Sequence, residues 1–190
     1  MRFLAHLLGM IVVALAFGFG LSWYALEDGR LLGALRVGPW AAWPDVGAPS
    51  PNPYTRAYLS RTGALQLGLS EGVAFVAGHD SDGRPLAREC HYRVEGNTPV
   101  ATFWTLQALD PEGVSVATPG GPIEMHSARI ARVDQGTTVI HVSPTLAPMN
   151  WLETTGRGPF SLVLTLYDTS IFSSVGEAVQ TLPAITREAC

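Results

Sequence analysis

The stretch FSLVLTLY, residues 160–167, decides the fold class of this chain. Every second position in it is a large apolar residue: Phe160, Leu162, Leu164 and Leu166. A period of two places alternate side chains on opposite faces of an extended strand, whereas a helix repeats every 3.6 residues. The stretch therefore predicts a β-strand with one leucine-rich face turned toward a core.

Similar short segments, separated by turn residues, continue on both sides of this strand. We expect further strands over residues 73–77, 86–95, 100–109, 125–133, 137–143 and 184–189. Turns are predicted at Asp82-Gly83, at residues 110–113 and at residues 119–122. About seven or eight short strands with frequent turns are typical of a β-sandwich or jelly roll. The predicted fold class is mainly β, with this sandwich-like domain over residues 65–190.

One pair of these strands has a register that can be argued from the sequence. Residues 125–133 and 137–143 are predicted to form a hairpin with Gly136 in a left-handed turn position. That register places Ile130 opposite Ile140, so that apolar side chains meet on one face. A slip by one residue would pair apolar with charged side chains.

The chain begins with an apolar run, Phe3–Leu26, that contains no Asp, Glu or Arg. As a helix it would measure about 36 Å, against about 30 Å for the hydrocarbon core of a bilayer. Arg2 precedes the run and Glu27 follows it, so the basic end is expected in the cytoplasm. We expect a single-pass signal-anchor in a bacterial inner membrane, with the N-terminus cytoplasmic and the domain periplasmic. A signal peptide cleaved near Ala14-Leu15-Ala16 is the alternative.

The segment between the anchor and the β domain is rich in Pro and Gly. Residues 27–64 are expected to be a linker followed by a short helix, with Asn52 as its N-cap and Pro53 at its first position. The predicted organisation is therefore an anchor over residues 1–26, this linker and helix, and the β domain.

The charge composition argues against one class of binding partner. The chain carries 12 Lys and Arg against 16 Asp and Glu, a formal net charge of −4, and all its basic residues are Arg. Because Arg2 is the one charged residue before Glu27, the part after the anchor is more acidic still. An acidic domain without a basic stripe argues against binding to nucleic acid.

The two cysteines, Cys90 and Cys190, lie far apart in the sequence. An oxidising compartment would allow them to form a disulfide. Closing a loop of about 100 residues is worth up to about 4.7 kcal/mol in the chain-entropy model. The alternative is a buried thiol at Cys90 and an exposed one at Cys190.

The sequence contains no set of residues that defines a reaction. There is no nucleophile elbow and no phosphate-binding loop, and we predict no catalytic residues and no cofactor. Glu124 and His126 would share a strand face and are weak candidates for metal ligands, but zinc sites use three or four protein ligands. The sequence favours a protein without enzymatic activity.

Several motifs together resemble a known bacterial family. They are PVATFWTL at 99–106, DPEG at 110–113, NWL at 150–152, GPFSL at 158–162 and the Leu166-Tyr167 pair. In this order and spacing they are similar to the family named domain of unknown function twelve-fourteen. The resemblance covers about residues 65 to 190. The chain departs from the family pattern at Glu153, where the family has Pro, and at Thr165, where it has Arg.

The resemblance implies a mostly β fold, an envelope protein and no established reaction. Family members usually form the C-terminal half of a longer protein, whose N-terminal half is domain of unknown function twelve-fifty-four. Here an anchor stands upstream instead. The expected partners are the lipid bilayer, through residues 3–26, and a separate membrane-anchored protein that carries the other half.

Four residues of the family motifs are candidates for a ligand cleft between the sheets: Trp104, Asn150, Trp151 and Tyr167. In that interpretation the protein would be an anchored enzyme or a small-ligand-binding domain. The competing interpretation is structural, with the indoles packed in the core and Asn150 bonded to the backbone of its own turn.

Overall fold

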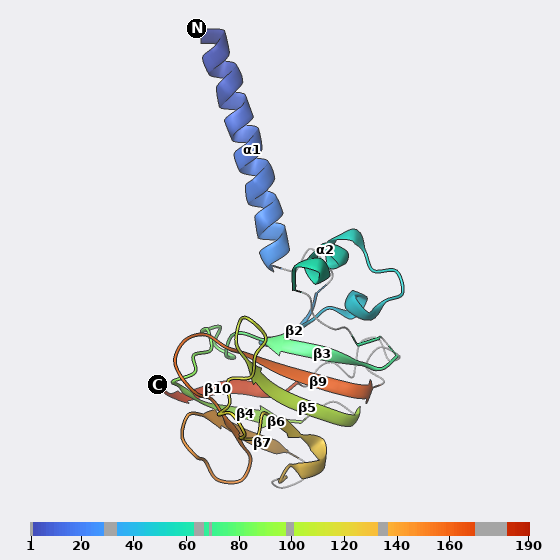
Figure 1. Cartoon of the computed structure of the whole chain (residues 1–190), viewed down its shortest axis with the longest axis vertical. Coiled ribbons are helices and arrows are strands. Elements are labelled where there is room, and N and C mark those ends of the chain that lie inside the picture. The colour runs from blue at the N-terminus through green and yellow to red at the C-terminus, as the bar shows by residue number, and fades with distance from the viewer. Residues whose placement is uncertain are drawn as a thin grey trace.

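The computed structural model describes residues 2–28, 34–62, 67–68, 70–97, 101–132, 137–169 and 182–190. An N-terminal helix, α1 (Arg2–Asp28), projects from a domain made of two β-sheets, as Figure 1 shows. The expected fold class is confirmed: mainly β, two sheets and one apolar N-terminal helix.

The larger sheet has six antiparallel strands in the order β1-β2-β3-β9-β5-β6. Their bounds are β1 Leu35–Val37, β2 Trp40–Ala42, β3 Gly72–Ala77, β5 Ala101–Leu109, β6 Glu124–His126 and β9 Ser161–Thr169. The alternation in residues 160–167 places Leu162, Leu164 and Leu166 on the inner face, each at most 2% exposed. Phe75 of β3 and Leu106 of β5 lie on either side of Leu164, so the apolar residues of three strands form one inner face.

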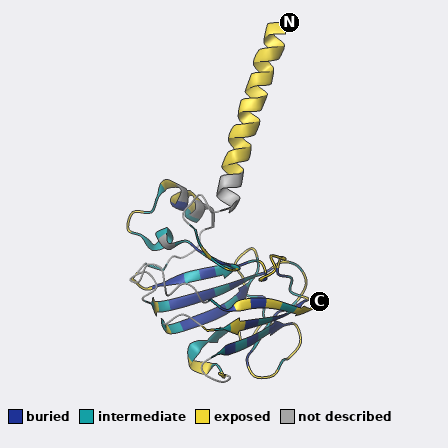
Figure 2. Cartoon of the chain, turned by 180° about the vertical axis from the view of Figure 1, so that it is seen from behind, coloured by how far each residue is buried: buried dark blue, intermediate teal, exposed yellow. Residues whose placement is uncertain are grey.

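The smaller sheet has four strands in the order β10-β4-β7-β8, with β7 and β8 parallel. Their bounds are β4 His91–Gly96, β7 Thr138–Ser143, β8 Trp151–Glu153 and β10 Ala184–Ala189. Val94, Val142 and Ile185 are buried and belong to the same core cluster as the inner face of the larger sheet. Figure 2 shows this buried layer between the sheets and the exposed surface of α1. Burying each such side chain contributes about 1.5–3 kcal/mol.

The predicted hairpin between residues 125–133 and 137–143 is wrong. β6 ends at His126 and pairs with β5 of the larger sheet, and a 3₁₀ turn, η3 (Ser127–Arg129), follows it. β7 pairs instead with β4 and β8, so both of its edges are occupied. Of the expected pairing, the described residues keep a bridge between Arg132 and Thr138. The expected turn at Gly136 lies outside the described residues.

The segment expected to be an irregular linker contains regular structure. β1 and β2 form a short antiparallel hairpin that extends the larger sheet, with Gly38 at φ 57° in the turn. Trp40 is fully buried, and its indole N–H donates to the carbonyl oxygen of Pro183 at 2.7 Å. Burial of this aromatic side chain against the core outweighs the low strand propensity of the surrounding Pro and Gly residues.

The short helix is confirmed as α2 (Pro53–Thr62), preceded by the 3₁₀ turn η2 (Pro44–Gly47). The side-chain oxygen of Asn52 accepts a hydrogen bond from the Thr55 N–H at 2.9 Å, which is the predicted N-cap. The predicted strand over 86–95 begins later than expected, at His91.

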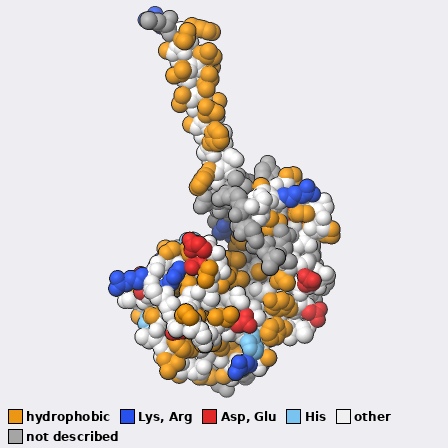
Figure 3. All heavy atoms as spheres, in the orientation of Figure 1, with side chains coloured by type: hydrophobic (Ala, Val, Ile, Leu, Met, Phe, Trp, Pro, Cys, Tyr) orange, Lys and Arg blue, Asp and Glu red, His pale blue; other side chains and the backbone are white. Residues whose placement is uncertain are grey.

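Helix α1 is long and apolar enough to cross a membrane. Residues Arg2–Trp23 have a mean hydropathy of 2.2, and none of this span is buried against the domain. Figure 3 shows apolar side chains along its length. A signal sequence near the N-terminus has the same properties, so length and composition alone do not separate an anchor from a cleaved leader.

Candidate functional site

Trp104 and Tyr167, two of the four candidate cleft residues, lie on opposite faces of the larger sheet. Trp104 is 3% exposed and points inward, where it lines a narrow apolar cavity with Trp40, Ile140 and neighbouring core residues. Tyr167 points outward and packs against Phe103, with ring centroids 5.8 Å apart. Trp104 and Leu166 are direct cross-strand partners, which places the next residue, Tyr167, on the other face.

Asn150 and Trp151 lie elsewhere, at the start of β8. Asn150 is 2% exposed, and its amide group makes three hydrogen bonds with backbone groups. Its Nδ2 donates to the carbonyl oxygens of Ala131 (2.6 Å) and Val139 (2.7 Å). Its Oδ1 accepts from the Ala131 N–H at 2.8 Å. The side-chain amide of Asn150 is therefore bonded to the backbone of Ala131 and Val139.

Trp151 and Asn150 brace the loop that joins β7 to β8. The Trp151 indole N–H donates to the carbonyl oxygen of Ser143 at 3.1 Å and lies 3.2 Å from its hydroxyl. The Ser143 hydroxyl donates to the Thr145 carbonyl oxygen at 2.6 Å. This network holds both ends of the loop. We name residues 144–149, Pro144 to Met149, the apolar tip.

The apolar tip exposes two large hydrophobic side chains. Leu146 is 80% exposed and Met149 is 65% exposed. Met149 also has φ 65°, a left-handed backbone conformation that costs an L-residue about 1–2 kcal/mol. Such strain at an exposed residue is a reason to look for a function there. No sequence motif pointed to these residues; the one available signal is that PTLAPM contains no charged residue.

A row of three rings lies on the outer face of the larger sheet. The ring centroids of His126 and Phe103 are 5.6 Å apart, and Phe103 also contacts Tyr167. Next to His126, the Glu124 carboxylate accepts a hydrogen bond from Gln107 at 2.9 Å. The Nδ1 atom of His126 is buried and has no hydrogen-bond partner among the described residues, which is an unusual state for a buried polar atom.

Glu124 and His126 do share a face of β6, as expected, because their cross-strand partners are Gln107 and Thr105. Within the described part of the chain, no group of three or more His, Cys, Asp or Glu side chains could hold a metal ion. The two residues thus supply one pair of potential ligands.

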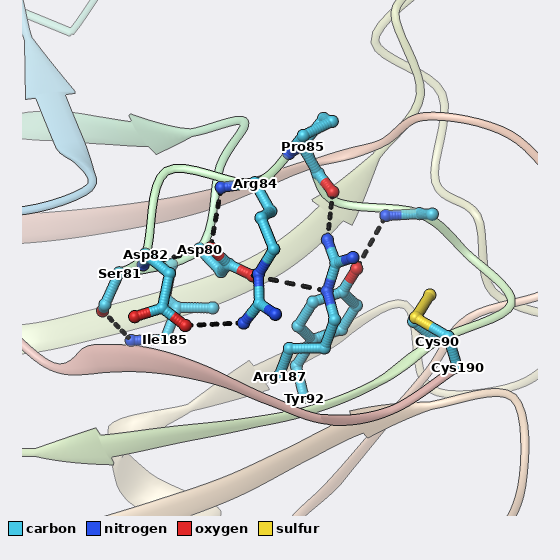
Figure 4. A network of polar contacts seen from close by, with 11 residues as sticks. Asp80, Ser81, Asp82, Arg84, Pro85, Cys90, Tyr92, Ile185, Arg187 and Cys190 are labelled. Atoms are coloured by element: carbon cyan, nitrogen blue, oxygen red, sulfur yellow. Dashed lines mark hydrogen bonds and ion pairs between the residues drawn. A yellow bond between two sulfur atoms is a disulfide. The ribbon is translucent and has the colours of Figure 1, made fainter.

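The C-terminal strand is held by a disulfide and by an ion cluster around the buried carboxylate of Asp80, drawn in Figure 4. Cys90 and Cys190 form the disulfide, with their Cα atoms 4.1 Å apart. Arg187 of β10 lies over the Tyr92 ring, with its guanidinium carbon 5.4 Å from the centroid. Its Nε atom lies 3.3 Å from the Asp80 carboxylate, which Arg84 also contacts at 3.0 Å.

The charge state of Asp80 follows from this cluster. Burial raises the pKa of the Asp80 carboxyl, but the hydrogen bond from the Arg84 N–H and the charges of Arg84 and Arg187 outweigh burial. The pKa of Asp80 therefore lies below its usual value, and the residue is an anion that fixes the turn and the end of β10. A fully paired carboxylate of this kind stabilises structure.

A β-sandwich domain behind an apolar N-terminal helix is the class of protein that this architecture defines. The chain belongs to the family described as "Protein of unknown function (DUF1214)", whose pattern matches residues 71–171. This match confirms the resemblance drawn from the FWTL, NWL and GPFSL motifs. No curated protein matches the chain.

Two solved structures are similar to the chain at low sequence identity. The VPA0106 protein from Vibrio parahaemolyticus aligns with a TM-score of 0.53 and 16% identity over 71% of this chain and 35% of its own. A putative uncharacterized protein from Burkholderia cenocepacia aligns with a TM-score of 0.48 and 15% identity over 92% of this chain and 52% of its own. The first likeness supports the fold. The chain spans between about a third and about half of the length of these two proteins.

Proposed function

We propose that this protein is a domain held at the bacterial inner membrane by α1, which acts in the periplasm by binding a protein partner. The location is supported by the apolar span Arg2–Trp23 and by the disulfide between Cys90 and Cys190. Disulfides persist in oxidising compartments such as the periplasm and are rare in the cytosol. Arg2 before the span favours a cytoplasmic N-terminus.

The proposal of a protein partner rests on how little of a similar solved structure this chain matches. The matching region makes up 35% of the VPA0106 protein, so in that protein the fold occurs together with much additional polypeptide. We propose that a separate membrane-anchored protein supplies the counterpart here. Membrane anchoring would favour such an association, because two chains held in one bilayer have a high effective concentration.

Purification of the full chain in a mild detergent, expressed at its native level, tests this function. A second envelope protein should co-purify in a fixed molar ratio, and its anchor and sequence can be determined by mass spectrometry. The control is α1 fused to an unrelated periplasmic domain, which detects association through the helix alone. Recovery of single chains or homo-oligomers only would contradict the proposal.

A second candidate function is ligand binding at the outer face of the larger sheet. One observation favours it: the buried Nδ1 of His126, beside Phe103, has no partner in the part of the chain that the structure describes. Metal analysis of the purified full chain tests it. Bound zinc, nickel or iron at one equivalent, lost in His126→Ala and retained in His91→Ala, would support this function. A metal-free protein whose melting temperature is unchanged by those metals would oppose it.

A further inference from the structure

The apolar tip has the properties of a docking element that is already ordered before it binds. Leu146 and Met149 are largely exposed, although each has an apolar side chain that would gain free energy from burial. Between Ser143 and Asn150 the chain has no charged residue. Core packing does not explain these side chains, since neither is buried in the domain.

The backbone of the tip is fixed from both ends. Asn150 bonds three backbone groups at one end, and the Ser143 hydroxyl bonds the Thr145 carbonyl oxygen at the other. The left-handed Met149 lies directly beside Asn150. A loop that is ordered in advance loses little conformational entropy on association, which increases affinity for a given contact area.

A segment with two basic residues runs beside the base of the tip. The Asn150 amide holds both backbone groups of Ala131, so the segment with Arg129 and Arg132 runs beside the base of the tip. Both arginines are exposed. No Asp or Glu occurs between Thr137 and Leu152. An apolar centre with basic residues at its border matches a pocket whose rim carries carboxylates.

We propose that the apolar tip is the surface through which this domain binds its protein partner, inserting Leu146 and Met149 into an apolar pocket rimmed by carboxylates. This inference rests on the proposed function and identifies the surface of the domain that would bind the partner. In Figures 1 and 2 the loop between β7 and β8 lies at the end of the domain away from α1. That position favours a protein partner over the membrane in which α1 would lie.

Photocrosslinking in intact membranes tests the contact. A benzophenone side chain at position 146 of the full chain should give one discrete adduct with a single protein, identified by mass spectrometry. The matched control is position 114, because Val114 is also exposed, at 61%, and lies on a different turn. Equal adducts from both positions, an adduct with lipid, or an adduct with a second copy of this chain would overturn the proposal.

A binding variant can be made without damage to the fold. In Leu146→Ser with Met149→Gly, both apolar side chains are removed, and glycine adopts the φ of 65° without strain. The double variant should melt at or above the wild-type temperature and recover the crosslinked partner at least tenfold less well. Val114→Ser should recover it normally. Raising the salt concentration should weaken the wild-type complex, since the arginine contacts are screened.

The outcomes separate this inference from the function on which it rests. If the partner co-purifies equally with the double variant, the partner role stands and the assignment of the apolar tip is overturned. If no protein co-purifies with the wild-type chain, both are overturned.

Discussion

At the scale of single residues, Asn150 connects parts of the chain that are distant in sequence. Its amide joins Ala131, 19 residues away, and Val139, 11 residues away. The sequence marks Asn as a turn residue, and the structural interpretation expected it to bond its own turn. The partners could not be predicted, because nothing in the local pattern specifies which distant backbone groups a buried amide will meet.

Replacing Asn150 should destabilise the domain. In Asn150→Ala, the Ala131 N–H and the carbonyl oxygens of Ala131 and Val139 lose their partner. Leaving such groups unpaired should lower the free energy of unfolding by about 2–4 kcal/mol. Denaturant unfolding of the full chain in detergent, followed by tryptophan fluorescence, measures this. Thr145→Ala, on the exposed tip, should change it by less than about 0.5 kcal/mol. Equal stability of the two variants would refute the structural role of Asn150.

Asp80 should make stability depend on pH in the acid range. Its pKa in the folded state lies below 3.8, the ordinary value for an aspartate, which we take for the unfolded chain. The stabilisation is therefore fully present above that value and is lost as the pH falls through the folded-state pKa. In Asp80→Asn, this part of the acid dependence should disappear, and stability at neutral pH should also fall because Arg84 and Arg187 lose their anion.

The measurement is the free energy of unfolding of the full chain from about pH 7 to about pH 2. Asp82→Asn is the matched control, since the Asp82 side chain is 71% exposed and lies in the same turn. It should keep the acid dependence of the wild type. If the stability of Asp80→Asn fell with pH as steeply as that of the wild type, the ion cluster would contribute nothing to the acid dependence.

At the scale of elements, the alternation of apolar and polar residues predicted most of the strands but not which strands pair with each other. Residues 160–167 and 101–109 are central strands with one clear apolar face, and both were predicted within a few residues. The partner strand predicted for residues 125–133 was wrong. Alternation of apolar residues shows which side chains share a face of a strand, but it does not specify which strand lies beside it. The hairpin carrying Trp40 was missed because Pro and Gly flank it, and its burial depends on the distant Pro183.

The stability of the domain, and of β10 at the edge of the smaller sheet in particular, should depend strongly on the disulfide. Cys90 and Cys190 close a loop of 100 residues, for which the chain-entropy model gives up to about 4.7 kcal/mol. Cys190→Ser should lower the free energy of unfolding by a large part of that amount. Reductant should destabilise the wild type in the same way and leave the Cys90→Ser, Cys190→Ser double variant unaffected. A wild type insensitive to reductant under unfolding conditions would contradict this expectation.

At the scale of the whole molecule, the segment after α1 and the C-terminal strand are parts of one structure. The first described strand after α1 begins at Leu35, and Trp40 then donates to Pro183 next to β10. The disulfide closes the other end of β10. The chain that leaves the proposed membrane anchor is therefore fixed next to the same strand that the disulfide holds at its other end.

The proposed location predicts that the redox state of the cysteines depends on α1. The full chain, acid-trapped in cells, should contain no thiol that can be alkylated, because the proposed periplasmic location would let Cys90 and Cys190 oxidise to the disulfide. A chain that lacks residues 2–23 should remain in the reducing cytosol and show two alkylated thiols by mass spectrometry. Cys190→Ser in the full chain, with one thiol, calibrates the assay. Two free thiols in the exported wild type would place the domain outside an oxidising compartment and remove the main support for a periplasmic location.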